Sequence, residues 1–487
     1  MTADVATPSA ERSAMDQSLE LIADIRAGGE AIRGRSSRYL PKYQKETDDD
    51  YRRRVSAAPW RPEFVDTLRS LASKPFAQDV LVADDTPPEI RALADDIDGR
   101  GNNLTRFAHQ AFTEGLANGV HAILVDYTQI HSNASRADEI ALGARPYWTH
   151  IPVTSIVALR IERVRGRDVV THLRYRAGRN AFDGFQEKVV EQIHVREPGL
   201  WTVWEKNASG VWEIASTGEI RIAGKVPSEV PLALFFTGQR IGDLQTRSAL
   251  QDLAEVQIEL FRALSRQDEI LTYTGSPMLA ANGVSAPGPE AAPIVLGPKS
   301  ILFAPGDHAK WGYISPDAAA IGEVRKHVES VEAAMHRLGM QPSMPMSGSI
   351  TATASAVNAA KAHSAVEAWA TALKDCLEHA FWFTAQWVGS SHETVVQVFS
   401  DFAVGDQNSD EAALLLDATE AGVISGRTMR EELRRRNILS PGFDPDKEAR
   451  RLSDERRRAA GPVTPDPLPV PVSTPARRRT ARKPAAA

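Results

Sequence analysis

The sequence predicts an α+β protein in which helical segments surround a region of antiparallel strands. Three observations support this fold class. Apolar residues recur at helical spacing near the start of the chain, in residues 11–30, and again in residues 354–395. Runs of β-branched and aromatic residues, separated by Gly, Asn, Asp or Pro, fill residues 146–236, which is typical of an antiparallel meander. Residues 243–271 contain neither Gly nor Pro, so we expect one long helix over 241–271.

The composition of the 487-residue chain is that of a globular protein, with 42% hydrophobic and 25% charged residues. Its length predicts about two to four domains. The 57 basic and 63 acidic residues leave a net charge of -6, which argues against a protein that coats nucleic acid through overall positive charge. The single cysteine, Cys376, fits a reducing compartment and excludes cysteine-based metal sites. We find no apolar run of membrane-spanning length and no signal-peptide pattern, so we expect neither secretion nor membrane insertion.

The first part of the chain is predicted to combine helices with one buried strand. Helical periodicity indicates three segments, 11–30, 61–72 and 86–117. The third segment is interrupted by the turn cluster DDIDGRGNN at 95–103. The apolar run HAILVDY at 121–127 is predicted to be a short buried strand, and the meander follows it.

The second part is predicted to be mainly helical. A Pro- and Gly-rich insertion with short strand candidates, 272–316, separates the long helix from a second one at 317–339. That helix begins with Ser315-Pro316-Asp317, which suits a capped helix start, and stops at Gly339. An uncharged loop at 340–353 contains two prolines and leads into a third helix at 354–395.

The C-terminal residues divide into a helical unit and a tail. In residues 396–460 we expect Gly422 to end one helix and Ser425 to cap the next. Residues 461–487 are Pro-rich and end in a basic cluster, so we expect disorder. Electrostatic contact with a polyanion and a purely solubilising role both remain open for this tail.

No established catalytic or metal motif is present. GPKS at 297–300 lacks the glycine spacing of a phosphate-binding loop. DDIDG at 95–99 lacks the first ligand and the closing glutamate of a calcium loop, and His392-Glu393 lacks the second histidine of a zinc-protease helix. Cys376 lies on the apolar stripe of the third helix, which favours a core role over a nucleophile. We therefore predict no catalytic residue, no metal site and no cofactor, and expect a protein that is not an enzyme.

Four strings in this order, YLPKYQKETDDDYRRRV, GVHAILVDY, ARPYWTHIPVTSIV and TGSPML, together with the helix-loop-helix that follows, resemble the portal proteins of tailed bacteriophages. The resemblance covers roughly residues 15–455. It implies a wing at 1–240, stem helices at 241–271 and 317–339, a clip at 272–316, a tunnel loop at 340–353, a long wing helix at 354–395 and a crown at 396–460.

Portal proteins similar to this chain form a ring, usually of twelve subunits, at one capsid vertex, and a separate terminase motor drives DNA through the central channel. The resemblance therefore implies a homo-oligomeric ring that binds double-stranded DNA weakly and without sequence preference. Its partners would be the terminase large subunit, a head-tail adaptor and the major capsid protein, with no membrane contact. It would lie at the portal vertex of the virion head, and in the host cytoplasm during assembly. ATP hydrolysis would belong to the terminase.

The resemblance also implies three sets of site residues. The tunnel loop would touch DNA without formal charge through Gln341, Ser343, Met344, Met346, Ser347 and Ser349. The clip would contact terminase and the adaptor through Trp311, Tyr313 and Lys299. Acids on the first stem helix would repel phosphates if they face the lumen, namely Asp252, Glu255 and Glu259. The alternatives are an ordinary interhelical turn, local packing and a solvent-exposed helix face, respectively.

Two other functions are weighed against the portal. A nucleic-acid-processing enzyme could use the α/β region as a cleft, with acids such as Asp126 in its active site. A nuclease assay and the mass in solution would discriminate between them. A head-tail adaptor is disfavoured because such proteins are usually much shorter and lack the helical stem.

Overall fold

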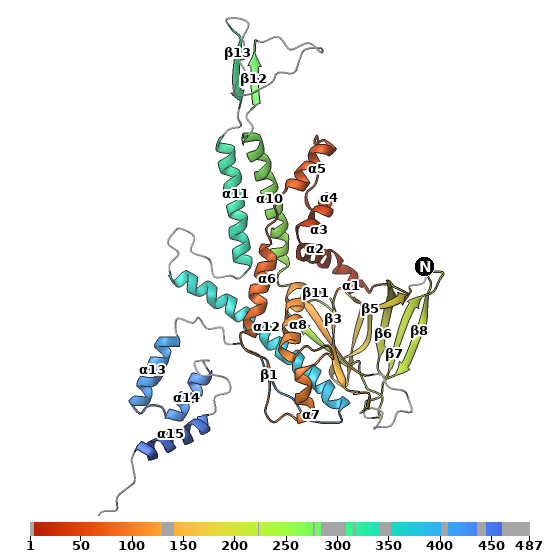
Figure 1. Ribbon diagram of the computed structural model, residues 1–487, viewed down its shortest axis with the longest axis vertical. Helices are drawn as coiled ribbons and strands as arrows, with labels where there is room; N and C mark the ends of the chain where they lie inside the picture. The colour runs from red at the N-terminus through yellow and green to blue at the C-terminus, as the bar shows by residue number, and fades with distance from the viewer. Residues whose placement is uncertain are drawn as a thin grey trace, which may run out of the picture. The chain divides into compact units, whose positions relative to one another are not determined.

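The computed structural model divides into two compact units, Met1–Phe402 (unit 1) and Ala403–Ala487 (unit 2) (Figure 1). Helices and antiparallel strands share the chain, which confirms the predicted α+β class. Among the helices described, none is long and apolar enough to cross a membrane. The structure describes residues 4–128, 141–222, 224–275, 278–283, 308–314, 318–339, 352–400, 408–435 and 445–459.

Short helices open unit 1: α1 (Ala10–Ala14), α2 (Asp16–Ala27), α3 (Gly29–Gly34), α4 (Ser36–Tyr39), α5 (Asp48–Ala57) and α6 (Glu63–Ser73). The prediction of one helix over 11–30 is wrong, because the chain breaks at Met15 and again at Gly28. Gly28 has a φ of 93°, a backbone conformation that favours glycine and that does not occur within a helix. The helix therefore ends at Gly28, although the apolar residues keep helical spacing on both sides of it. Helix α6 agrees with the prediction over 61–72.

The predicted interruption at 95–103 separates α7 (Pro88–Arg91) from α8 (Leu104–Asn118). The side chain of Asn103 accepts the N–H of Arg106 at 2.9 Å and caps α8. Gly119, with a φ of 88°, ends this helix in a left-handed conformation. The next residue already belongs to a strand.

That strand is the centre of a three-stranded antiparallel sheet of order β3-β2-β9, whose members span Pro146–Pro152, Val120–Tyr127 and Leu232–Phe236. Because side chains alternate along a strand, β2 contributes to two cores. Ile123 and Val125 share a core with α8 and with the long helix α12 (Ala352–Trp387). Ala122 and Leu124 share the other core with residues of the larger sheet. The small sheet therefore joins the helices to the larger sheet.

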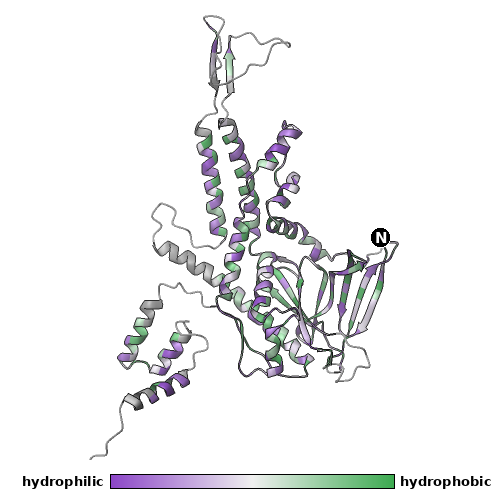
Figure 2. Cartoon of the chain, in the orientation of Figure 1, coloured by the Kyte–Doolittle hydropathy of each residue, from purple (hydrophilic) through white to green (hydrophobic). Residues whose placement is uncertain are grey.

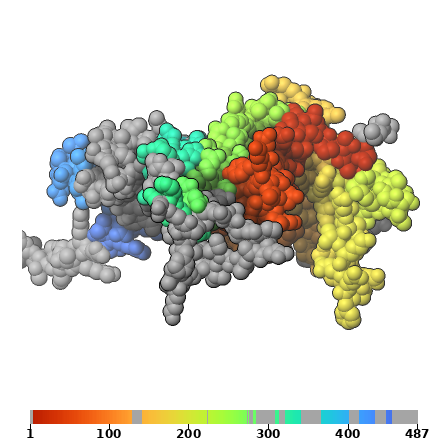
Figure 3. Space-filling view, turned by 90° about the horizontal axis from the view of Figure 1, so that it is seen from above, coloured from red at the N-terminus to blue at the C-terminus, as the bar shows by residue number. Residues whose placement is uncertain are grey.

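The larger sheet follows chain order, β4-β5-β6-β7-β8, with strands at Ile156–Val164, Arg167–Asp183, Gln186–Glu197, Leu200–Lys206 and Trp212–Glu219. The predicted meander is confirmed for these strands, but β3 and β9 belong to the small sheet instead. A turn redirects the chain between β3 and β4, where the N–H of Ser155 donates to the carbonyl of Pro152 at 2.9 Å. The strands coloured yellow project from the body in Figure 3, and the β5-β6 hairpin exposes Phe182 and Phe185.

Unit 1 ends later than the sequence predicted. Helix α12 stops at Trp387, close to Gly389, whose φ is 75°. Strand β14 (Val396–Gln397) then pairs with β1 (Leu81–Val82), so residues from 396 to 402 belong to unit 1 and not to a separate helical unit.

Unit 2 contains α13 (Asn408–Glu420), α14 (Gly426–Arg435) and α15 (Pro445–Ala459). The predicted helix end is confirmed, since Gly422 has a φ of 71°. The predicted cap is confirmed too, because the hydroxyl of Ser425 accepts the N–H of Thr428 at 3.1 Å. The predicted tail, 461–487, lies outside the described residues.

Two histidines form a buried pair between the strands of the small sheet. His121 Nε2 lies 2.9 Å from His150 Nδ1, and the ring of Phe107 stacks on His150 with centroids 3.7 Å apart. Among the described residues, His121 Nδ1 and His150 Nε2 have no hydrogen-bond partner. Burial lowers the pKa of His121 to about 3, and burial lowers the pKa of His150 to about 4 although Asp98 and Glu114 oppose the shift. Both rings are therefore neutral in the folded protein at neutral pH.

We predict that unit 1 loses stability as the pH falls from about 6.5, the ordinary histidine pKa, toward 4, because the unfolded chain binds protons that these two folded histidines exclude. The expected loss at pH 5 is about 2 kcal/mol per histidine. Thermal unfolding between pH 7.5 and 4.5 measures it. A variant with both His121→Leu and His150→Phe should match the parent near neutral pH and decline less steeply in acid. Equal slopes for the two proteins would contradict the prediction.

Candidate functional site

Two long helices, α10 (Gln251–Gly275) and α11 (Ala318–Leu338), lie side by side and run in opposite directions (Figure 1). Polar and apolar residues alternate along both of them (Figure 2). Val328, Val331 and Met335 of α11 are buried in the same core cluster as the apolar stripe of α10. The two strands β12 (Met278–Asn282) and β13 (Lys310–Ile314) form an antiparallel hairpin beyond the far ends of these helices. The sequence predicted the helix pair, and α11 matches its predicted bounds closely.

Helix α10 begins at Gln251, later than the predicted residue 241. The preceding residues form a small antiparallel hairpin, β10 (Gln239–Arg240) with β11 (Thr246–Arg247). The loop of that hairpin donates three backbone N–H groups to the carboxylate of Glu11 in α1. The donors are Asp243, Leu244 and Gln245, at 3.3, 2.7 and 3.1 Å. Burial raises the pKa of Glu11, but these three donors and Arg240 outweigh burial and lower it below the ordinary value. The N-terminal segment thus holds the entry to α10 in a non-helical conformation.

A buried amide fixes α10 to α6. Gln257 lies in the apolar stripe of α10 and is fully buried. Its Nε2 donates to the carbonyl of Arg61 at 2.8 Å, and its Oε1 accepts the N–H of Phe64 at 3.0 Å. Phe64 is in the first turn of α6, where N–H groups have no partner inside the helix. Arg61 also forms an ion pair with Glu332 of α11, so one short segment connects all three helices.

The acids predicted to line a lumen share one exposed face of α10. Asp252, Glu255 and Glu259 are all exposed, as their spacing of three and four residues predicts. Asp252 pairs with Arg247, and Glu255 accepts a hydrogen bond from Gln251 at 3.0 Å. The same face continues into two exposed arginines, Arg262 and Arg266. The face is therefore acidic near the body of unit 1 and basic farther along, rather than acidic throughout.

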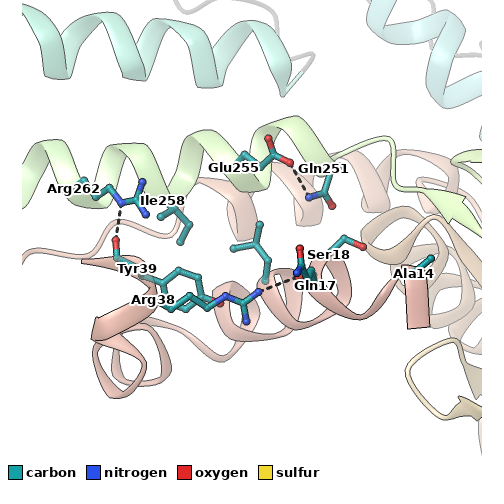
Figure 4. Close-up of a pocket in the computed structure, with 10 residues that line it drawn as sticks. Ala14, Gln17, Ser18, Arg38, Tyr39, Gln251, Glu255, Ile258 and Arg262 are labelled. Carbon is teal, nitrogen blue, oxygen red and sulfur yellow. Dashed lines mark hydrogen bonds between the residues drawn. The ribbon is translucent and has the colours of Figure 1, made fainter. Parts of the chain in front are cut away.

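An open groove of about 480 Å³ runs beside this face, between α10 and the helices α2 and α4 (Figure 4). Across it, Arg262 Nε donates to the carbonyl of Tyr39 at 2.7 Å. Arg38, on the opposite wall, pairs with Glu20 at 2.6 Å. Burial raises the pKa of Tyr39 to about 12, and the hydrogen bond from its hydroxyl to Asp24 adds to this shift. Each charged side chain that lines the groove, Arg38, Glu255 and Arg262, thus has a hydrogen-bond partner within the protein, which is typical of a structural contact between helices.

The structure places the other predicted site residues as follows. Trp311 lies opposite Ala281 and Tyr313 opposite Leu279 in the β12-β13 hairpin, so the two aromatic residues belong to one strand at the end of the helix pair. Lys299 lies outside the described residues, and so do the tunnel-loop residues Gln341, Ser343, Met344, Met346, Ser347 and Ser349. The predicted strands within 284–307 also lie outside them.

Asp126, the candidate acid of the enzyme alternative, is part of a mostly buried ion pair. Its carboxylate lies 2.6 Å from Arg196 Nη2, which joins β2 of the small sheet to β6 of the larger one. Burial raises the pKa of the neighbouring Tyr147 to about 12, and Asp126 contributes to the shift. Cys376 is buried in the core, as predicted, and burial raises the pKa of its thiol. In the part of the chain that the structure describes, no three His, Cys, Asp or Glu side chains form a candidate metal site.

Sequence reasoning missed the residues that position the helix pair. A lone polar residue within an apolar stripe is a weak signal, and Gln257 interrupts the stripe between Leu253 and Leu260. Glu11 gave no signal, because its partners lie more than two hundred residues away along the chain.

We predict that Gln257→Leu destabilises unit 1 by about 2–4 kcal/mol, because the substitution leaves the N–H of Phe64 and the carbonyl of Arg61 buried without their partner. Gln267→Leu, the same change farther along α10 at a less buried position, is the matched control and should have a much smaller effect. Thermal or denaturant unfolding of the full chain measures both. Equal effects of the two substitutions would show that the buried amide has no special role.

A family model described as a domain of unknown function (DUF4055) matches residues 249–388, less than a third of the chain, and this match spans α10 to α12. No curated protein matches the chain. Solved structures that it resembles include a chain from the neck of a native GTA particle computed with C12 symmetry, at a TM-score of 0.40 and 11% identity, covering 77% of this chain and 89% of that one. A chain from the virion of a native gene transfer agent (GTA) particle gives a TM-score of 0.41 at 12% identity, covering 77% of this chain and 89% of that one. A chain from the neck of an empty GTA particle computed with C6 symmetry gives a TM-score of 0.42 at 12% identity, covering 82% of this chain and 93% of that one. Similarities of this size carry no functional conclusion here.

Proposed function

We propose that this chain is the subunit of a ring-shaped portal at one capsid vertex of a phage-like particle, through which double-stranded DNA enters and leaves. The observation that carries the proposal is the antiparallel pair α10 and α11 with the β12-β13 hairpin at its far end. In the chain, this arrangement stands between the sheets and the long helix α12. It is the order of wing, stem, clip and long wing helix that the sequence resemblance implies.

The length of α10 suits a channel wall. With 25 residues, the helix is about 37 Å long at 1.5 Å per residue. DNA rises 3.4 Å per base pair, so a ring of such helices would surround about 11 base pairs, roughly one turn of the duplex.

The charges of α10 suit DNA that must slide. Affinity for DNA grows with the number of phosphates that basic side chains neutralise. The exposed face of α10 carries three acids and two arginines, and Arg262 is engaged by the carbonyl of Tyr39. We propose that Asp252, Glu255 and Glu259 face the lumen, where they repel phosphates and keep binding weak and independent of sequence.

The remaining surfaces would serve assembly. In this proposal the ring is a dodecamer, the hairpin with Trp311 and Tyr313 forms the clip that meets the terminase large subunit and the head-tail adaptor, and the two sheets form the wing toward the major capsid protein. The chain itself performs no catalysis, and terminase supplies ATP hydrolysis. The assembled ring resides in the virion, after assembly in the host cytoplasm.

Native mass spectrometry of the purified full chain, with an assay for nuclease activity on the same sample, tests this proposal. We expect a closed oligomer near twelve copies that leaves double-stranded DNA intact in the presence of divalent metal ions. A monomer that cleaves DNA only when a divalent metal is present would overturn the portal and favour the enzyme.

A further inference from the structure

Unit 2 has no buried core among the side chains described in it. Within 413–433 and 447–454 no side chain is buried, whereas unit 1 contains two extended core clusters. Leu414, Leu416 and Val423 are 69%, 49% and 76% exposed. Short helices in water are marginal without tertiary packing, because ordering the chain costs entropy that burial must offset. Unit 2 therefore requires a surface that covers its apolar residues.

The exposed leucines lie on two sides of α13. Leu414 and Leu416 are two positions apart, which places them about 200° apart around a helix. Leu415, between them, is half-buried. A single helix packed against α13 cannot cover both leucines, so we expect a surface formed by two helices, between which α13 lies.

The charges of unit 2 are separated between its helices. Helix α13 contains four acidic residues and no basic residue. Helices α14 and α15 together contain ten basic and six acidic residues, a net charge of +4. The three helices as a whole are therefore neutral but bipolar, with an acidic apolar helix at one end and basic helices at the other.

We propose that α13 of one copy docks against the basic surface of α14 and α15 of the next copy, so that the C-terminal units associate head to tail. Each unit would offer an acidic apolar surface to one neighbour and a basic surface to the other. Such heterologous contacts close into a ring when the rotation between copies permits. The inference rests on the proposed function only in taking the assembled state to be a closed ring.

The charge distribution of unit 2 favours a second copy of the chain, rather than DNA, as the partner that covers the exposed leucines of α13. A surface that binds the DNA backbone gains affinity from an excess of positive charge. The four acids of α13 cancel that excess within the unit, and they would repel phosphates close to the exposed leucines. In a head-to-tail contact the same four acids meet the basic helices of the neighbour, where complementary charges also fix the register.

Two charge-reversal variants of the full chain test the contact. Variant A carries Asp417→Arg and Glu420→Arg in α13, and variant B carries Arg450→Glu and Arg451→Glu in α15; all four residues are exposed in one chain. Each variant alone should assemble at concentrations about tenfold higher than the parent, because the two reversals cancel the net charge of α13 in variant A and of α14 with α15 in variant B, so every contact loses its charge complementarity. A control with Asp85→Arg and Glu162→Arg, exposed acids of unit 1, shifts the net charge as variant A does and should assemble like the parent.

Mixing the variants shows whether the contact lies between copies. In a ring that alternates A and B, each reversed α13 meets a reversed α15 and each unreversed α13 meets an unreversed α15. Assembly should therefore recover in the mixture, as native mass spectrometry of A and B with different isotope labels would show. A contact within one chain could not be repaired by mixing, so defective single variants without recovery would overturn the inference.

A further variant tests whether misfolding, rather than loss of the contact, causes defective assembly. Leu414→Gln with Leu416→Gln removes the apolar contacts without reversing charge, and it should weaken assembly while leaving the unfolding temperature of unassembled chains unchanged, because both leucines are exposed there. Assembly equal to the parent in this variant and in A and B would overturn the docking and leave the portal proposal intact. A parent chain that forms no ring would instead overturn the portal itself.

Discussion

The burial of one side of α10 in the body of unit 1 is the constraint on which the projecting part of the molecule depends. Leu250, Leu253, Leu260, Phe261 and Leu264 are almost completely buried along this side. Each such side chain contributes about 1.5–3 kcal/mol when it leaves water. Gln257 lies in the same stripe, and its burial is tolerated because its amide is hydrogen-bonded at both ends. The base of the helix is thereby fixed, and its continuation with α11 can carry the hairpin away from the body.

Unit 1 and unit 2 differ in the interactions that stabilise their folded states. Unit 1 contains its own cores, joined by the small sheet and by the buried pair of Asp126 and Arg196. None of the described side chains of unit 2 is buried, so in the head-to-tail contact proposed above its stability would be linked to association. A subunit built in this way can fold its body first and order its C-terminal helices as copies assemble. In such a ring, the C-terminal helices of each copy would become ordered only when the adjacent copies are present.

Local signals in the sequence were sufficient for much of the fold. The caps at Asn103 and Ser425 and the glycines at 119 and 422 mark helix ends by chemistry that acts within a few residues. The strand over 121–127 was predictable because its apolar run has no polar alternation, as a strand buried on both faces requires. The exposed face of α10 was also readable, because its charged residues, Arg262 and Arg266 included, recur three and four positions apart.

The features that the sequence did not predict depend on contacts between residues far apart in the chain. Strands β3 and β4 have the same β-favouring composition, and only their partners, β2 for one and β5 for the other, assign them to different sheets. The entry to α10 is set by Glu11 of the N-terminal segment, more than two hundred residues earlier in the chain. Gly28 breaks a helix whose periodicity continues on both sides. The candidate clip was predicted as a β-containing insertion, and the pairing of its described strands, from Met278↔Ile314 to Asn282↔Lys310, became visible only in the structure.

The most direct measurement of the portal proposal is a cryo-EM reconstruction of the assembled full chain, viewed along its symmetry axis. The prediction is a closed ring in which α10 and α11 of every copy border the central opening and the face with Asp252, Glu255 and Glu259 points into it. A closed ring with α10 at its outer rim, or particles with no central opening, would contradict the proposal.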